Sequence, residues 1–161
     1  MFKGALTAIL MATFAAGTLD ALAAIIFYGP ILGKATVGQI FRGIASGAFG
    51  KSAFQGGKIM AVDGVIFHYI NAFCFSVFYF FVYPIFKFSK NHPVLAGIIY
   101  GIFVWLIMNL VVIPLSKIGW SPIHFLPAVE AILILIFMVG IPVSLIMNSH
   151  YQSRTEHEEV D

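Results

Sequence analysis

Four long apolar runs divide the chain, and short stretches of polar, glycine and proline residues separate them. The runs cover about residues 4–28, 60–83, 94–115 and 125–147. Each is long enough to cross the hydrocarbon core of a bilayer, which takes about 20 apolar residues. Because lipid offers no partners for backbone N–H and C=O groups, runs of this kind are helical. The pattern therefore predicts four transmembrane helices.

The connection between the first two runs has a helical pattern of its own. Apolar residues recur with helical spacing at positions 37, 40, 41, 44, 45 and 48. The surrounding segment contains no acid and carries four basic residues, Lys34, Arg42, Lys51 and Lys58. A basic amphipathic helix of this kind lies in the membrane interface or dips back into the bundle. We expect such a helix at about residues 36–50.

The composition also separates this chain from soluble proteins. Its 161 residues are 60% hydrophobic and 10% charged, and the mean hydropathy is +0.97, whereas about a quarter of the residues in a soluble domain are charged. We therefore predict one membrane domain, residues 1–150, and a polar acidic tail, residues 151–161, that is solvated and partly disordered. The fold class is an all-α integral membrane protein: an antiparallel four-transmembrane-helix bundle with an additional interfacial or re-entrant helix after the first span.

The charge pattern bears on partners and on topology. The formal net charge is +2 and the basic residues are scattered, so the predicted partner is the lipid bilayer and not nucleic acid. The closely spaced Lys87 and Lys90 favour a multi-pass topology with both termini in the cytoplasm. The first run resembles a signal peptide, but it continues through Phe27, which favours an uncleaved span. Cys74 is the single cysteine, which excludes a disulfide framework.

Polar side chains inside the apolar runs are the candidates for function, because burying them in lipid is costly without a partner or an aqueous cavity. Asp20, His68, Asn109 and Glu130 each lie on a different span. At a rise of 1.5 Å per residue, all four fall on the same side of the bilayer, about 8 to 12 Å below its surface. They predict one polar layer. Arg42 is the expected counter-ion for Asp20 or Glu130.

This polar layer has several interpretations. Its side chains can serve only as hydrogen bonds between helices, or they can relay protons or accompany a small solute. Imidazole and carboxylate also suit zinc or manganese, although no His-x3-His or Glu-x2-His spacing points to a metal. Separately, Gly97-x3-Gly101 offers a small-residue face to another membrane helix, from a second copy or from a different protein. The last interpretation would make the chain an accessory subunit.

Two stretches of the chain resemble the YagU family of bacterial inner-membrane proteins. They are HYINAFCFSVFYFFVYPIFK, from His68, and LAGIIYGIFVWLIMNLVVIPLS, from Leu95. The resemblance covers roughly half of the chain, from Gly64 onward, while the segment IFRGIASGAFGKSAFQGG is similar to a related group of small bacterial membrane proteins. It implies a bacterial inner membrane and a first loop that faces the periplasm. It implies no activity, and it carries over no catalytic residues.

The sequence contains no GxSxG, HExxH, Walker or dinucleotide motif, so neither an enzyme nor a cofactor is predicted. A bundle of this length encloses little volume, so a carrier or channel is expected to need a homo-oligomer. The functional hypothesis is proton-linked or small-solute handling through the polar layer. The alternative is a structural or accessory membrane subunit.

Overall fold

A computed structural model describes the backbone of residues 2–85 and 88–160 and the side chains of residues 4–85 and 88–153. Lys87 and the last acidic side chains lie outside these ranges. Helices make up nearly all of the described chain, which contains no strand. In chain order they are α1 (Phe2–Ile26), α2 (Val37–Phe49), α3 (Gly57–Val82), α4 (Phe88–Asn91), α5 (Pro93–Ile107), α6 (Ile113–Leu115), α7 (Phe125–Leu135) and α8 (Ile141–Val160). The all-α class is confirmed.

Shorter turns of different width extend several of these helices. π-helical turns follow α1 over Phe27–Ile31 and α5 over Met108–Val112, and a third joins α7 to α8 over Ile136–Gly140. Tighter 3₁₀ turns, Gly50–Phe54 and Tyr83–Ile85, follow α2 and α3. Three of the long helices therefore contain a wide turn, which becomes important at the candidate site.

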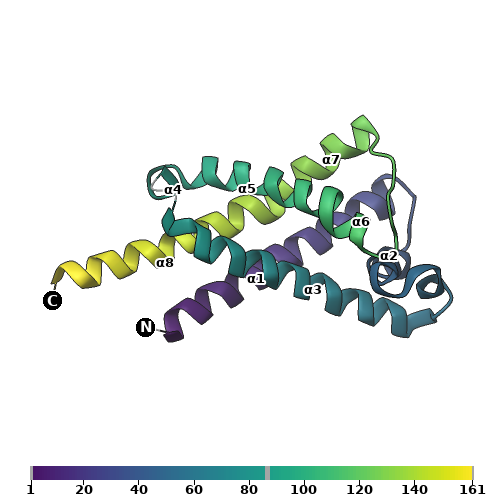
Figure 1. Ribbon diagram of the computed structural model, residues 1–161, viewed down its shortest axis with the longest axis horizontal. Helices are drawn as coiled ribbons and strands as arrows, with labels where there is room; N and C mark the ends of the chain where they lie inside the picture. Colours follow the sequence, from purple (N-terminus) through teal and green to yellow (C-terminus); the bar gives the residue numbers. More distant parts are fainter. Residues whose placement is uncertain (1, 86–87, 161) are drawn as a thin grey trace.

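Four helical stretches are long and apolar enough to cross a membrane: Gly4–Ile31, Gly57–Ile85, Pro93–Leu115 and Phe125–Ser153. The prediction of a multi-pass membrane protein is confirmed at this level of length and composition. In Figure 1 both termini lie at one end of the molecule and α2 lies at the other. We refer to these as the terminal end and the α2 end.

The backbone of α8 continues without interruption into the acidic tail, to Val160. Once a helix is nucleated, each added residue gains a backbone hydrogen bond at little cost. No glycine or proline occurs between Ser149 and Val160 to end it.

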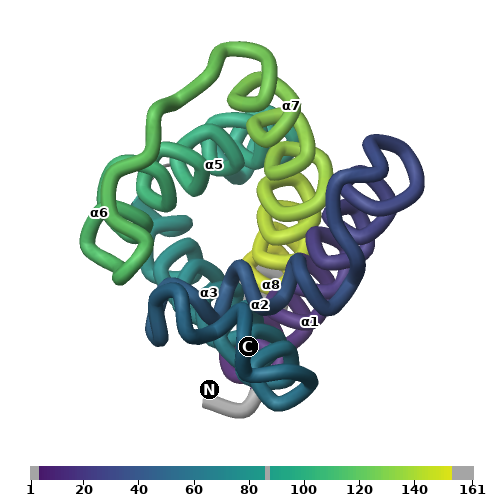
Figure 2. The backbone as a smooth tube through the Cα atoms, turned by 90° about the vertical axis from the view of Figure 1, so that its right-hand side faces the viewer, coloured from purple at the N-terminus to yellow at the C-terminus, as the bar shows by residue number. Residues whose placement is uncertain are grey.

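The structure contains a helix at Val37–Phe49, where the sequence pattern predicted one over residues 36–50. A capping box starts it: the Thr36 side chain accepts a bond from the Gln39 backbone N–H, and Gln39 Oε1 accepts one from the Thr36 N–H at 2.8 Å. Gly50, at φ +65°, ends it. Seen from the α2 end in Figure 2, α2 runs across the end of the bundle.

The α2 helix is attached to the bundle by backbone contacts. Its buried residues are Phe41, Ala45 and Ser46. A Cβ placed on Gly64 of α3 would lie 1.9 Å from the Phe41 carbonyl oxygen, so the two helix backbones meet there. The Lys117 N–H also donates to the Gly47 carbonyl oxygen at 2.8 Å. The helix is thus joined both to α3 and to the loop before α7.

The outer surface of the bundle is strongly apolar. Phe14, Phe81 and Phe137, from three different spans, are 64%, 66% and 59% exposed. A continuous apolar surface of this extent is unusual for a soluble monomer. It is consistent with contact between the helices and the lipid bilayer.

The closest contact between two spans joins α5 to the π turn and α8. A Cβ on Gly97 would lie 2.6 Å from Ile141 Cα, and one on Gly101 would lie 2.6 Å from Ile136 Cα. A Cβ on Gly140 would lie 2.1 Å from the Gly97 carbonyl oxygen. The Gly97-x3-Gly101 face is therefore filled within this chain. It is not the free docking face for another helix that the sequence suggested.

Replacing Gly140 by alanine is predicted to destabilise the bundle, because the added methyl group collides with backbone that cannot rotate away. We expect a loss of about 1–3 kcal/mol, the usual cost of overpacking, measured as a lower thermal unfolding temperature in detergent. Gly43→Ala on α2 is the control, since nothing lies within 4 Å of its added Cβ. Equal unfolding temperatures for the two variants would contradict the proposed helix contact.

Candidate functional site

A cavity of about 290 Å³ lies inside the bundle, bounded by all four spans and by Ile44 of α2. Most of its wall is apolar, but six side chains with hydrogen-bonding or ionisable groups line it: Asp20, Tyr28, His68, Asn71, Trp105 and Asn109. Three of the four residues predicted to form a polar layer, Asp20, His68 and Asn109, thus line one space.

On the first span, the residues that line the cavity follow helical spacing. They are Ala16, Gly17, Asp20, Ala24 and Tyr28, which are three or four positions apart except for the adjacent first pair. The small side chain of Ala24 leaves space on this wall, whereas the Tyr69 ring fills the position where a Cβ on Gly17 would lie. Asp20 lies eleven residues before the end of its span at Ile31, or about 16 Å along the helix. This is deeper than the sequence predicted.

His68 is held between three helices. Its Nε2 lies 2.8 Å from the Gly17 carbonyl oxygen of α1, and because a carbonyl oxygen can only accept, Nε2 carries the hydrogen. Its ring meets Phe41 of α2 and Tyr69 of its own helix edge-on, at centroid distances of 6.4 and 5.6 Å. Asp20, one turn beyond Gly17, is close enough to His68 for their charges to interact.

Each of the three wide turns contains or precedes a proline. Pro30 lies inside the first turn, and Pro114 and Pro142 each follow a turn by two residues. Proline lacks an N–H and its ring clashes with the carbonyl four residues earlier, so the regular α-helical bonding is disrupted there. The cavity residues Tyr28, Asn109 and Val139 all lie in these turns. Wide turns of this kind recur at functional sites.

The π turns were not foreseen from the sequence, although the three prolines were a signal for them. Asn71 was also missed as a lining residue. His68, Asn71, Ala72 and Phe75 have the spacing of one helix face, so the position of His68 could have identified it. In the third span, the Asn109 Nδ2 donates to the Trp105 carbonyl oxygen at 2.9 Å.

The remaining two predicted residues do not line the cavity. Glu130 is half-buried on α7 and lies close enough to Tyr28 to affect it electrostatically. Arg42 was expected to pair with Asp20 or Glu130, but its guanidinium donates to the backbone carbonyl oxygens of Gly38 at 3.1 Å and Phe54 at 3.3 Å. The arginine therefore serves to join α2 to the turn that follows it.

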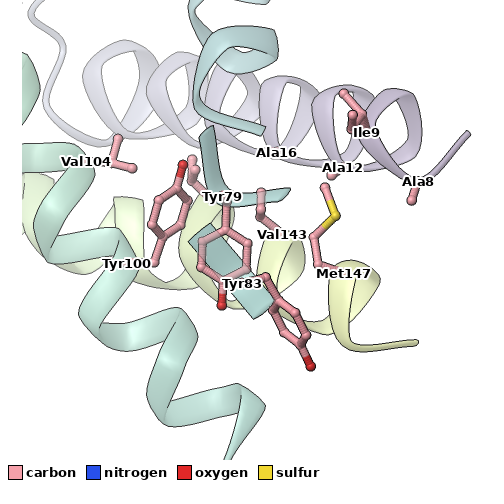
Figure 3. Packing of buried hydrophobic residues seen from close by; sticks show 11 residues of the cluster. Ala8, Ile9, Ala12, Ala16, Tyr79, Tyr83, Tyr100, Val104, Val143 and Met147 are labelled. Carbon is pink, nitrogen blue, oxygen red and sulfur yellow. The ribbon is translucent and has the colours of Figure 1, made fainter. Parts of the chain in front are cut away.

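A tyrosine-rich core closes the cavity toward the terminal end. Figure 3 shows Tyr79, Tyr83 and Tyr100 beside Val143 and Met147. The Tyr100 hydroxyl donates to the Phe75 carbonyl oxygen at 2.6 Å, and Tyr83 donates to Asn148. We call this layer the tyrosine floor; its members are Tyr79, Tyr83, Tyr100, Val143 and Met147.

Ser144 connects three helices within this floor. Its Oγ donates to the Pro93 carbonyl oxygen at 2.7 Å. Since the hydroxyl hydrogen is used there, the Tyr79 hydroxyl donates to Ser144 Oγ, also at 2.7 Å. The chain Tyr79–Ser144–Pro93 thus links α3, α8 and α5 on the terminal side of the cavity.

Within the described residues there is no group of three or more His, Cys, Asp or Glu side chains placed to hold a metal ion. The arrangement offers instead one carboxyl, one imidazole, two amides, a phenol and an indole in an otherwise apolar wall. No family model, curated protein or solved structure matches this chain.

Ser144→Ala is predicted to lower the unfolding temperature in detergent, because it removes two hydrogen bonds: the one that Ser144 donates to Pro93 and the one that it accepts from the buried Tyr79 hydroxyl. Ser89 is the hydroxyl neighbour that Tyr79 keeps. Hydrogen bonds between membrane helices contribute about 0.6 kcal/mol on average and up to about 1.7, so we expect a loss within that range. Ser149→Ala, on the exposed face of the same helix, is the control. A similar response of the two variants would argue against the assigned network.

Proposed function

We propose that this chain is a bacterial inner-membrane protein that takes a small solute into its cavity and links occupancy to a proton on Asp20. In this proposal the four spans cross the membrane in antiparallel order, with both termini in the cytoplasm and α2 on the periplasmic side. The resemblance to the YagU family supports the choice of membrane. The cavity supports the choice of function.

The observation that carries the proposal is the position of Asp20. It lies about 16 Å along the helix from the end of its span, on a wall from which lysine and arginine are absent among the described lining residues. An ionisable group at such a depth is costly and is usually retained for binding or proton transfer. Ala24, one turn away on the same wall, is small and leaves space beside the carboxyl, whereas a purely structural carboxyl would be enclosed by its hydrogen-bond partners.

The tyrosine floor favours a carrier over an open channel. Tyr83, Val143 and Met147 are almost completely buried, at 1%, 1% and 0% exposure. A solute that enters from the α2 end meets this layer and stops. Passage would require the helices to move, and the wide turns at Pro30, Pro114 and Pro142 are the positions where their regular bonding is already interrupted. All four spans of one chain contribute to the cavity wall.

The alternative, a structural or accessory subunit, is favoured by one contact. The bond between His68 Nε2 and the Gly17 carbonyl oxygen joins α3 to α1 as a structural hydrogen bond does. In that case the polar layer only holds helices together. The two functions make opposite predictions for Asp20.

Asp20→Asn keeps the size and hydrogen-bonding capacity of the side chain and removes its charge. We predict an unfolding temperature in detergent equal to or above that of the parent, because site residues are held at a cost in stability. A structural role predicts a decrease equivalent to about 0.6 kcal/mol or more. A decrease of that size would favour the accessory subunit.

Solvent access to the cavity tests the proposed function directly. In a Cys74→Ser background, Ala131→Cys places a thiol on the cavity wall, and Leu133→Cys places one on the apolar outer face two residues away, where Leu133 is 49% exposed. We predict that the neutral, water-soluble reagent 2-hydroxyethyl methanethiosulfonate modifies residue 131 much faster than residue 133 in membrane vesicles. Equal, slow modification would mean that the cavity is not open to solutes, and the proposed function would fail.

A further inference from the structure

The cavity wall has the electrostatic character of a site for a cation. Asp20 is the one carboxyl among the described lining residues, and neither lysine nor arginine is found among them. Arg42, which the sequence predicted as the counter-ion of Asp20 or Glu130, donates instead to two backbone carbonyl oxygens. An anion placed beside an ionised Asp20 would therefore meet repulsion in surroundings of low dielectric constant, where charge interactions are strong.

The rest of the wall is suited to an apolar body. Phe75 and Trp105 contribute aromatic rings, and rings of this kind attract cations that have lost part of their water. The remaining side chains are largely aliphatic, such as Ile44, Val104 and Met108. A sugar or another polyhydroxyl solute would leave most of its hydroxyl groups without partners here, at a cost for each.

The size of the cavity limits the solute. A volume of about 290 Å³ corresponds to about ten water molecules at their liquid volume. A single aromatic ring with a small ammonium group fits in this volume. A bare divalent metal ion is disfavoured because the described residues offer no group of three ligands.

We infer that the solute is a compact apolar monocation, such as a protonated arylalkylamine or a small quaternary ammonium ion, bound by Asp20 beside Phe75 and Trp105. This inference rests on the proposed function and specifies its substrate class. Cation and proton compete for the same carboxyl: when the cation binds, the O–H bond of protonated Asp20 breaks, its electron pair stays on the carboxylate, and one proton leaves to water. Binding is then tighter at higher pH, through Asp20.

The other titratable groups near Asp20 fix the interpretation of that pH dependence. His68 of α3 faces it and donates from Nε2 to the Gly17 carbonyl oxygen. Tyr28 lies two turns from Asp20 along the same span, and it interacts electrostatically with both Asp20 and Glu130 of α7. Arg42 is the ionisable group on α2, and it does not line the cavity. A Glu130→Gln variant therefore separates a contribution of the second carboxyl from that of Asp20.

Charged thiol reagents test the inference at the same cysteine. With Ala131→Cys in the Cys74→Ser background, we expect the cationic 2-(trimethylammonio)ethyl methanethiosulfonate to react at least about tenfold faster than the anionic 2-sulfonatoethyl reagent, after correction for their reactivity with a free thiol. Asp20→Asn should remove this preference, and Asp20→Glu should keep it. Leu133→Cys is the position control.

The outcomes separate the two proposals. If the neutral hydroxyethyl reagent fails to reach residue 131, the proposed function fails, and the substrate class with it. If the neutral reagent reaches residue 131 but the cationic and anionic reagents react equally, the cavity is open and the inference of a cation is overturned. A preference that survives in Asp20→Asn would also overturn the assigned role of this residue.

Reversible binding gives a second readout. Trp105 and Trp120 are the two tryptophans of the chain, so Trp120→Phe leaves the lining residue Trp105 as the single reporter. Benzyltrimethylammonium should change its fluorescence in a saturable way and release protons into a weakly buffered solution. Phenylmethanesulfonate, an anion with the same aromatic body, should do neither. Binding of both ions, or benzyltrimethylammonium binding without proton release, would contradict the inference.

Discussion

Where Gly97 and Gly101 of α5 meet Gly140, two helix backbones come so close that no side chain fits between them. The hydrophobic effect cannot hold helices together in lipid, because lipid tails are as apolar as leucine. Close backbone packing and a few hydrogen bonds have to do so instead. The Tyr79–Ser144–Pro93 chain of hydrogen bonds lies beside this contact and adds α3 to the pair. Together they fix the terminal half of the bundle.

The half nearer α2 is built in a different way. Pro30 and Pro114 interrupt two of the spans there, and the turn before Pro142 lies near the middle of the last span. The three wide turns hold Tyr28, Asn109 and Val139 on the wall of the cavity. The small side chain of Ala24 on α1 leaves space beside Asp20. The result is a firmly packed floor beneath a cavity with polar groups. This division is what a one-sided solute site requires, since a fixed floor prevents free leakage through the bundle.

The α2 helix covers this arrangement at the other end. It contributes Ile44 to the cavity, contacts Gly64 through backbone, and is bonded to the loop before α7 through Gly47. Arg42 stabilises α2 by donating hydrogen bonds to the carbonyl oxygens of Gly38 in the same helix and Phe54 in the turn that follows. Its guanidinium therefore does not neutralise a carboxyl inside the bundle. The absence of that neutralisation leaves Asp20 available for a mobile cation or a proton, which is the basis of the proposals made above.

The sequence by itself determined the elements. Apolar runs of membrane length predicted the four spans, and the helical spacing of residues 37–48 predicted α2, whose capping box at Thr36 and Gln39 and whose terminal Gly50 are all local signals. It also predicted that Asp20, His68 and Asn109 lie toward the same end. These features depend on contacts within one helix or one turn, so a single stretch of sequence contains the information.

Only the tertiary structure decided which faces meet. A helix that is apolar all round has no pattern to distinguish its lipid-facing side from its buried side, so the sequence could not tell that Glu130 and Arg42 lie off the cavity wall while Tyr28 lies on it. For the same reason, the Gly97-x3-Gly101 face suited an external partner as well as α8. Its pairing with Gly140 depends on residues about 40 positions away, and only the packed bundle brings them together.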